Sequence, residues 1–226
     1  MAKSNRALDM QQDNTVIMPF LSTYLFHQMW DNFEVVEDTE RQFKGIDVIV
    51  HYEKYDDNVD VKSQASAKYI NSPVPTFVLE CLFTNQAKKE QIGWWLDENL
   101  LTDSYLCVWV HAAKTNSRGL IDSPDDIIDI EIMLVDKLPL QEYIESKGYT
   151  HEALLNRARW MRKIGIHAQA SVLDEQPDDE MWLTYSPQLA EKPVNLVIKK
   201  RVLKKFATRH ARVTKSGVFD IVNDVL

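Results

Sequence analysis

Two carboxylates and a lysine lie in two neighbouring apolar segments, and together they could hold a divalent metal beside a phosphodiester. Asp47 interrupts the apolar segment 45–50, and Asp60 is followed by Val61 and Lys62. Side chains alternate between the faces of a strand, so Asp60 and Lys62 share one face and Val61 points to the other. A carboxylate in an apolar segment is costly unless it has a partner. The spacing therefore predicts two adjacent strands that bring the three side chains together.

This arrangement resembles the PD-(D/E)XK nuclease superfamily, in which an acidic residue and a later Asp/Glu-x-Lys hold catalytic magnesium. Ile46-Asp47 corresponds to the first motif, with isoleucine in place of the proline, and Asp60-Val61-Lys62 corresponds to the second. The resemblance covers residues 20–112. It implies an α/β fold with a restriction-endonuclease-like core, in which a mixed central sheet is flanked by helices and the order is helix, three-strand meander, helix, strand.

The resemblance implies a metal-dependent nuclease that hydrolyses phosphodiester bonds in DNA. Hard oxygen ligands suit Mg²⁺ or Mn²⁺, and one or two carboxylates with waters and phosphate suffice for Mg²⁺. Asp47 and Asp60 would be these ligands, together with the backbone carbonyl of Val61. Lys62 would position the attacking water or stabilise the charge of the transition state. Gln64, on the same strand face, would orient the substrate or a water.

A third acidic ligand is not evident from the sequence. Several members of the superfamily add an acid from a preceding helix, but residues 20–30 contain neither Asp nor Glu. Glu40 is the proposed substitute, and Glu37 and Glu34 are alternatives. Glu40 is equally well interpreted as an ordinary surface residue.

Apolar periodicity and turn residues predict the elements that position these side chains. The polar residues 1–14 are expected to be a disordered tail, residues 15–135 the nuclease-like core, and residues 136–226 a mostly helical C-terminal extension. The predicted helices are 19–30, 86–98, 139–147 and 150–163. The predicted strands are 33–37, 42–52, 59–69, 76–83, 104–112, 129–135 and 195–198, with 104–112 central.

Composition limits the class of protein. The chain has 226 residues, of which 45% are hydrophobic and 10% aromatic, enough for a substantial core. No apolar run reaches the roughly 20 residues that cross a bilayer, and the N-terminus lacks the apolar core of a signal peptide. Cys81 and Cys107 lie in apolar segments and are expected to be buried free thiols. A cytoplasmic protein is expected, with no membrane partner.

Positive charge is concentrated near the C-terminus. The net charge is −8, yet residues 192–215 contain nine Lys or Arg and no acid. Such a segment predicts a surface for polyanions, although a solvated helix face is an equally good interpretation. The residues expected to contact nucleic acid are Lys199, Lys200, Arg201, Lys204, Lys205 and Arg209.

Two other functions fit the same sequence. A non-catalytic nucleic-acid-binding or assembly protein could keep the nuclease scaffold and use residues 199–212 as its contact. A protein-interaction module could instead use the tryptophans and Tyr105 as a dimer interface, and a homodimer is compatible with the nuclease as well. The Asp–Lys pair would then be an ordinary surface ion pair of little energetic value.

Overall fold

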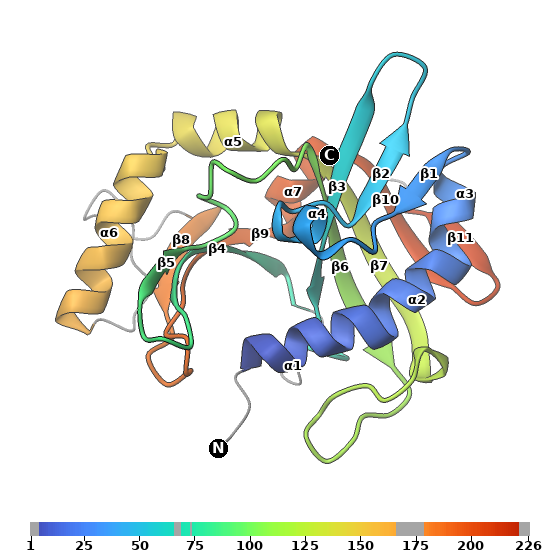
Figure 1. Ribbon diagram of the computed structural model, residues 1–226, viewed down its shortest axis with the longest axis horizontal. Helices are drawn as coiled ribbons and strands as arrows, with labels where there is room; N and C mark the ends of the chain where they lie inside the picture. Colours follow the sequence, from blue (N-terminus) through green and yellow to red (C-terminus); the bar gives the residue numbers. More distant parts are fainter. Residues whose placement is uncertain (1–4, 66–68, 73, 166–178, 222–226) are drawn as a thin grey trace. The chain divides into compact units, whose positions relative to one another are not determined.

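The computed structural model describes residues 5–65, 69–72, 74–165 and 179–221 (Figure 1). The chain forms two compact units, and each is assembled from three separate segments. Unit 1 consists of Met1–Ala7, Pro75–Leu100 and Leu138–Leu203. Unit 2 consists of Leu8–Val74, Leu101–Lys137 and Lys204–Leu226. The boundary expected after residue 135 lies beside the junction at Lys137, but each unit also takes segments from the other side of it.

Unit 2 contains a mixed seven-stranded sheet, in agreement with the predicted α/β class. Its first three strands form an antiparallel meander, and the fourth pairs with the third in parallel. All the remaining pairs are antiparallel. In sheet order the strands are β1 (Phe33–Val35), β2 (Val48–His51), β3 (Asp56–Gln64), β6 (Ser104–Ala112), β7 (Ile127–Asp136), β10 (Ala207–Thr214) and β11 (Gly217–Asp220). Two short helices, α4 (Thr39–Phe43) and the 3-10 turn η3 (Pro124–Asp126), connect strands.

An uninterrupted helical run leads into this sheet. It consists of α1 (Asn5–Gln12), the π-helical η1 (Asp13–Ile17), α2 (Met18–Leu21), the π-helical η2 (Ser22–Phe26) and α3 (His27–Met29). The expectation of a disordered tail over residues 1–14 is therefore wrong from residue 5 onward, and residues 1–4 lie outside the described residues. The apolar stripe that begins at Val16 packs on the sheet, and the preceding turns continue the same helix.

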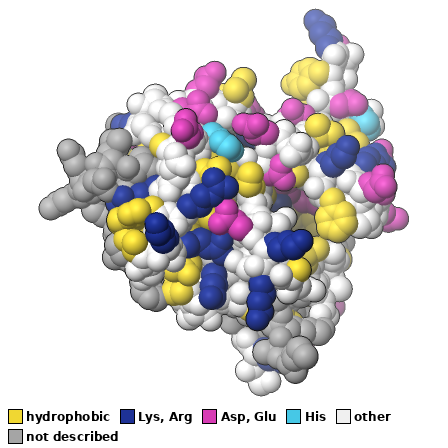
Figure 2. All heavy atoms as spheres, turned by 60° about the vertical axis from the view of Figure 1, so that its left-hand side comes forward, with side chains coloured by type: hydrophobic (Ala, Val, Ile, Leu, Met, Phe, Trp, Pro, Cys, Tyr) yellow, Lys and Arg dark blue, Asp and Glu magenta, His cyan; other side chains and the backbone are white. Residues whose placement is uncertain are grey.

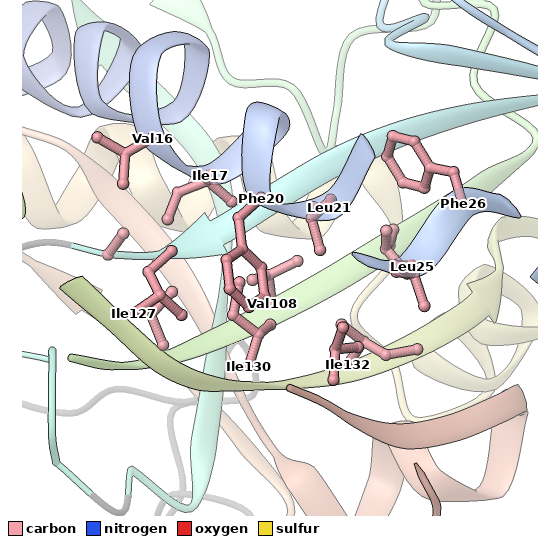
Figure 3. Packing of buried hydrophobic residues seen from close by; sticks show 14 of the residues in the cluster. Val16, Ile17, Phe20, Leu21, Leu25, Phe26, Val108, Ile127, Ile130 and Ile132 are labelled. Atoms are coloured by element: carbon pink, nitrogen blue, oxygen red, sulfur yellow. The ribbon is translucent and has the colours of Figure 1, made fainter. Parts of the chain in front are cut away.

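The core of unit 2 lies between this helical run and one face of the sheet. Phe20, Leu21 and Phe26 are fully buried and pack against residues such as Val108 and Ile130 (Figure 3). Nearly every residue of β6 is buried, which confirms that this apolar strand is central. A strand that is covered on both faces has no reason to alternate between apolar and polar residues.

Unit 1 contains an antiparallel four-stranded sheet and two long helices. In sheet order the strands are β5 (Glu90–Ile92), β4 (Thr76–Thr84), β9 (Val194–Lys199) and β8 (Met181–Tyr185). Helices α5 (Lys137–Ser146) and α6 (His151–Ile164) confirm the two helices predicted here. Thr150 caps α6 by accepting a hydrogen bond from the Ala153 N–H, and Gly165 ends the helix with φ of 73°. Helix α7 (Lys200–Phe206) follows β9 directly.

The helix predicted over residues 86–98 is wrong. Residues 90–92 form β5 instead, paired with Leu82–Thr84. Gly93 then passes so close to β4 that an added Cβ would lie 2.2 Å from the Glu80 carbonyl oxygen. The Trp95 N–H donates to that same oxygen at 3.0 Å. The apolar residues around Trp95 therefore pack as a turn against β4, which their helix-like spacing does not reveal.

The C-terminal part is not mostly helical. Beyond residue 136 the described residues contain three helices and four strands. Strand β10 pairs with β7 and β11 pairs with β10, so the basic stretch past Phe206 extends the unit 2 sheet. Alternation at Ala211–Val213, where Ala211 and Val213 are buried and Arg212 is exposed, suits a strand with one covered face.

Two further expectations concern burial and the membrane. Cys81 and Cys107 are both buried free thiols, as predicted. Burial raises the pKa of the Cys81 thiol to about 12, which keeps the thiol protonated and unreactive. Along the described parts of the chain, no helix is both long enough and apolar enough to span a membrane.

Two phenylalanines test the described core. Phe20→Ala empties a fully buried site, so we expect a loss of about 3–5 kcal/mol in the free energy of unfolding. Phe43→Ala is the matched control, because this ring is 72% exposed and its removal should change stability by less than about 0.5 kcal/mol. Urea denaturation measures both, and equal losses would contradict the packing described above.

Candidate active site

Unit 2 brings Asp47, Asp60 and Lys62 together at the start of β2 and along β3. The antiparallel pairing places Val48 opposite Val59. The backbone of Asp47 continues this pairing, because its N–H donates to the Val59 carbonyl at 3.0 Å. Asp47 therefore lies beside Asp60 even though twelve residues separate them along the chain.

The side chain of Asp47 is fixed by the backbone of β3. Its Oδ2 atom accepts a hydrogen bond from the Val61 N–H at 2.8 Å. This bond holds the carboxylate in line with β3 and gives it the partner that the sequence required. The role predicted for the Val61 carbonyl as a metal ligand stays a prediction, because the contact described here is made by the N–H.

Asp60 and Lys62 form an ion pair on one face of β3. The Lys62 Nζ atom donates to Asp60 Oδ1 at 2.5 Å. Asp60 is 1% exposed, whereas the Lys62 side chain is 27% exposed. Val59 and Val61 pack on the apolar core on the opposite face, which confirms the predicted alternation. Because its carboxylate is buried, this ion pair differs from the ordinary surface pair that the sequence also allowed.

One carboxylate oxygen of this pair has unused hydrogen-bonding capacity. Asp60 Oδ2 is buried, and no described N–H or O–H donates to it. Buried carboxylate oxygens are normally satisfied by a donor or a cation. The unsatisfied atom thus lies where a proton shared with Asp47, or a bound cation, would complete the site.

The electrostatics of the site favour a cation. Burial and the neighbouring Asp60 carboxylate raise the pKa of Asp47 to about 7, despite the opposing effects of Lys62 and the Val61 N–H. Burial alone lowers the pKa of Lys62, but Asp60 and Asp47 outweigh it and the pKa is raised overall. Lys62 therefore stays protonated. With both carboxylates ionised, the three groups carry one uncompensated negative charge.

The sequence interpretation missed a third acid near the site. Asp13, in η1, accepts a hydrogen bond from the Ser63 hydroxyl, and its charge contributes to the raised pKa of Lys62. The neighbouring Gln12 is buried; its amide donates to the Ala65 carbonyl and accepts from the Ile121 N–H at 2.8 Å. The polar sequence of residues 1–14 gives no local signal of this burial, so Asp13 is not recognisable as a site residue from the sequence.

The predicted third ligand does not join the pair. Glu40 is exposed on α4, where its N–H donates to Asp38 at 3.1 Å. Across the residues that the structure describes, no three His, Cys, Asp or Glu side chains gather closely enough to hold a metal ion. Neither Glu40 nor Asp13 thus completes a group of three with Asp47 and Asp60, and the site has two carboxylates.

Gln64 continues the Asp60–Lys62 face of β3. It is 4% exposed and stands opposite Trp109 of β6 in the parallel pairing. Its place on the strand agrees with the sequence, and its role in orienting a substrate or a water stays a prediction.

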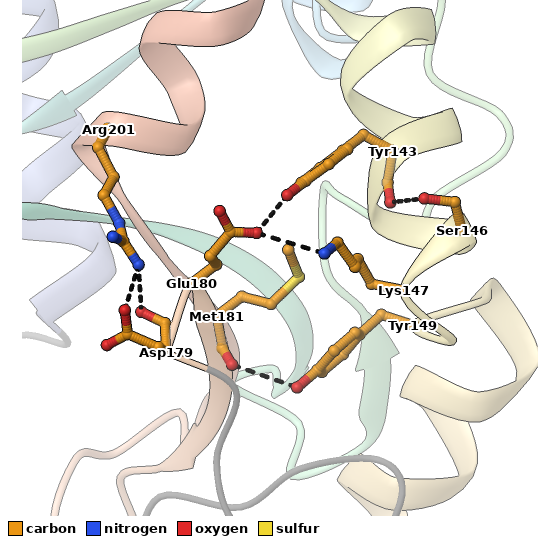
Figure 4. A network of polar contacts seen from close by, with 8 residues as sticks. All are labelled: Tyr143, Ser146, Lys147, Tyr149, Asp179, Glu180, Met181 and Arg201. Carbon is orange, nitrogen blue, oxygen red and sulfur yellow. Dashed lines mark hydrogen bonds and ion pairs between the residues drawn. The ribbon is translucent and has the colours of Figure 1, made fainter. Parts of the chain in front are cut away.

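The predicted nucleic-acid contacts are largely engaged within the chain. Asp179 pairs with Lys199 at 2.6 Å. It also pairs with Arg201, as Figure 4 shows. Hydrogen bonds from these two cations lower the pKa of Asp179. Arg209 pairs with Asp220 at 3.0 Å. Residues 192–215 contain no acid, but acidic residues from other parts of the chain pair with these three cations.

The remaining members of this segment are distributed over different elements. Lys200 opens α7, and Lys204 and Lys205 are exposed in its last turn. Within unit 1, Glu180 accepts a hydrogen bond from the Tyr143 hydroxyl and lies 3.7 Å from the Lys147 Nζ atom (Figure 4). Acidic and basic groups alternate here, so this part of unit 1 is not a uniformly positive surface.

The raised pKa of Asp47 predicts a pH-dependent stability. A pKa of about 7 in the folded chain, against about 3.9 when unfolded, gives a stabilising contribution that is complete below pH 4 and lost as the pH rises through 7. Without divalent metal, we therefore expect Asp47→Asn to be more stable than wild type at pH 8, by at most about 4 kcal/mol, and similar at pH 4.

Urea denaturation at a series of pH values measures this difference. Asp31→Asn is the control, because Asp31 is exposed and should show no such pH dependence. A constant difference between Asp47→Asn and wild type from pH 4 to pH 8 would contradict the raised pKa.

Asp47, Asp60 and Lys62 form the site, and the order of the strands gives its structural setting. Compared with protein-family models, with curated proteins and with solved structures, the chain has no match.

Proposed function

We propose that unit 2 is a metal-dependent nuclease that hydrolyses phosphodiester bonds in DNA. The observation that carries this proposal is the Asp47–Asp60–Lys62 group, in which one carboxylate is fixed by a backbone N–H and the other is buried against a lysine. Two carboxylates are a sufficient protein contribution for Mg²⁺ or Mn²⁺ when waters and phosphate provide the remaining ligands.

The order of the elements supports the PD-(D/E)XK resemblance. A helical run is followed by the antiparallel strands β1, β2 and β3, and then by β6 parallel to β3. Asp47 precedes the second strand, and Asp60 and Lys62 lie in the third. Three features depart from the superfamily pattern: the proline is missing, no helix occupies residues 86–98, and no third acid converges on the pair.

The donor set fits a hard divalent cation. Asp47 and Asp60 would supply oxygen ligands. The buried Asp60 Oδ2 atom accepts no hydrogen bond from the described residues, so it could bind the cation. A bound Mg²⁺ or Mn²⁺ would polarise the phosphoryl group and make hydroxide from water available near neutral pH. Occupancy requires Asp47 to be ionised, so protons and the metal compete for the same site.

The remaining residues would act on the substrate. Lys62 keeps its proton because two carboxylates face it, and its side chain is 27% exposed. A fixed positive charge there stabilises negative charge that develops on the phosphoryl oxygens during hydrolysis. Asp60 holds the ammonium in place through the 2.5 Å contact, and the charge of Asp13 further favours the protonated form of Lys62.

Cleavage assays test the proposal directly. Supercoiled and linear DNA are incubated with the protein and Mg²⁺, Mn²⁺ or EDTA, and we expect cleavage only with the metals. Asp60→Asn removes a ligand and Lys62→Met removes the fixed charge while keeping most of the side-chain length. Each should lower the cleavage rate about 100-fold or more.

The matched controls are Asp56→Asn and Lys54→Met, which change the same residue types at exposed positions of the β2–β3 hairpin. Both controls should keep the wild-type rate. Cleavage in EDTA, or equal rates for Asp60→Asn and Asp56→Asn, would contradict the proposal. DNA binding without any cleavage would favour the non-catalytic binding protein.

A further inference from the structure

Helix α6 presents one apolar face to unit 1 and a cationic face to solvent. Leu154, Ala158 and Met161 are buried, and the helix packs on β4, β8 and β9. With its cap at Thr150 and its glycine end at Gly165, α6 is a complete four-turn helix. Its outward side chains are therefore held by a defined scaffold.

The outward face combines cations with exposed apolar side chains. Trp160 is 39% exposed and Ile164, one turn later, is 46% exposed. The Arg157 guanidinium lies over the Trp160 ring at 3.9 Å from its centroid. Arg159 and Lys163 on the same helix are exposed. The Trp160 ring thus keeps part of its aromatic surface open to solvent beside several cations.

The adjacent strand β5 enlarges this cationic surface. Lys88 and Lys89, which precede the Glu90–Ile92 strand, are both exposed. Glu90 joins the two elements, because it pairs with Arg159 at 2.9 Å and with Arg162 at 3.5 Å. Residues 155–164 and 88–92 together contain six Lys or Arg and one acid, in a chain of net charge −8. Figure 2 brings this side of unit 1 forward, and Lys and Arg side chains lie among hydrophobic ones there.

We propose that this surface binds single-stranded DNA. The contact residues would be Lys88, Lys89, Arg157, Arg159, Trp160 and Lys163, which we call the α6–β5 surface. Its lysines and arginines would meet phosphates, and the Trp160 ring would stack on a base. Single-strand binding proteins combine these two features, since every base has an aromatic face and every nucleotide a charge.

The chemistry of the surface distinguishes this partner from others. An acidic protein would pair with the cations but would offer no planar group to the exposed part of the Trp160 ring, beyond the Arg157 guanidinium that already lies over it. Duplex DNA offers phosphates but keeps its bases stacked, so Trp160 would contribute little. The inference adds a holding surface for the substrate of the proposed nuclease, and the binding test below is independent of cleavage.

Fluorescence anisotropy with a labelled oligothymidylate, in EDTA and over a range of salt concentrations, tests the proposal on the full chain. The triple variant Lys88→Ala, Lys89→Ala, Lys163→Ala should reduce the salt dependence of log K by about 2, since each phosphate contact contributes roughly 0.7. Trp160→Ala should weaken binding about tenfold or more, and Trp160→Phe, which keeps an aromatic face, by much less.

The matched control is the triple variant Lys54→Ala, Lys114→Ala, Arg118→Ala, which removes the same charge from exposed positions of unit 2. It should keep the wild-type salt dependence, and circular dichroism should show that all variants are folded. Three outcomes would overturn the proposal. The wild-type protein could fail to bind the oligothymidylate at low salt, or the two triple variants could show the same decrease in salt dependence. Trp160→Ala could also weaken binding to duplex DNA as much as binding to the oligothymidylate. A loss of oligothymidylate binding that is confined to the variants of the α6–β5 surface would support the proposal, even if the chain cleaves no DNA.

Discussion

The structure depends on how two neighbouring carboxylates are held where little water reaches them. Asp47 and Asp60 repel each other, and burial raises the cost of ionising both. The Lys62 ammonium compensates the charge of Asp60, and the Val61 N–H donates a hydrogen bond to the Asp47 carboxylate. The remaining charge can be compensated by a proton or by a cation. A fold whose only requirement was stability would gain by replacing such a group with apolar residues, so its presence in β3 points to use of the site.

The rest of unit 2 is arranged so that this group keeps its geometry. The β2–β3 pairing fixes Asp47 beside Asp60, and β6 supports β3 from the other side. The helical run covers the opposite face with apolar side chains and is joined to the end of β3 through Gln12. The connection from β3 to β6 includes strands β4 and β5, which belong to unit 1.

Local patterns in the sequence were sufficient for some elements and insufficient for others. The apolar strand β6, the capped helix α6 and the alternation along β3 follow from short-range rules, and the structure confirms them. The turn around Gly93 could not be predicted, because it depends on close contact with the Glu80 backbone. Strand β10 pairs with β7 more than 70 residues earlier, and a basic segment gives no local sign of that pairing. Asp13 was missed because the polar start of a helix resembles a disordered tail until the buried side chain of Gln12 is known.

The most direct test of the central claim is the binding of Mn²⁺ followed by electron paramagnetic resonance, without DNA. The account predicts one bound Mn²⁺ per chain in the wild-type protein at pH 8. It also predicts loss of this binding in Asp60→Asn, and weaker binding as the pH falls below 7 and Asp47 takes up its proton. Absence of bound Mn²⁺ in the wild-type protein, or equal binding by Asp60→Asn, would contradict the interpretation of the two carboxylates as a metal site.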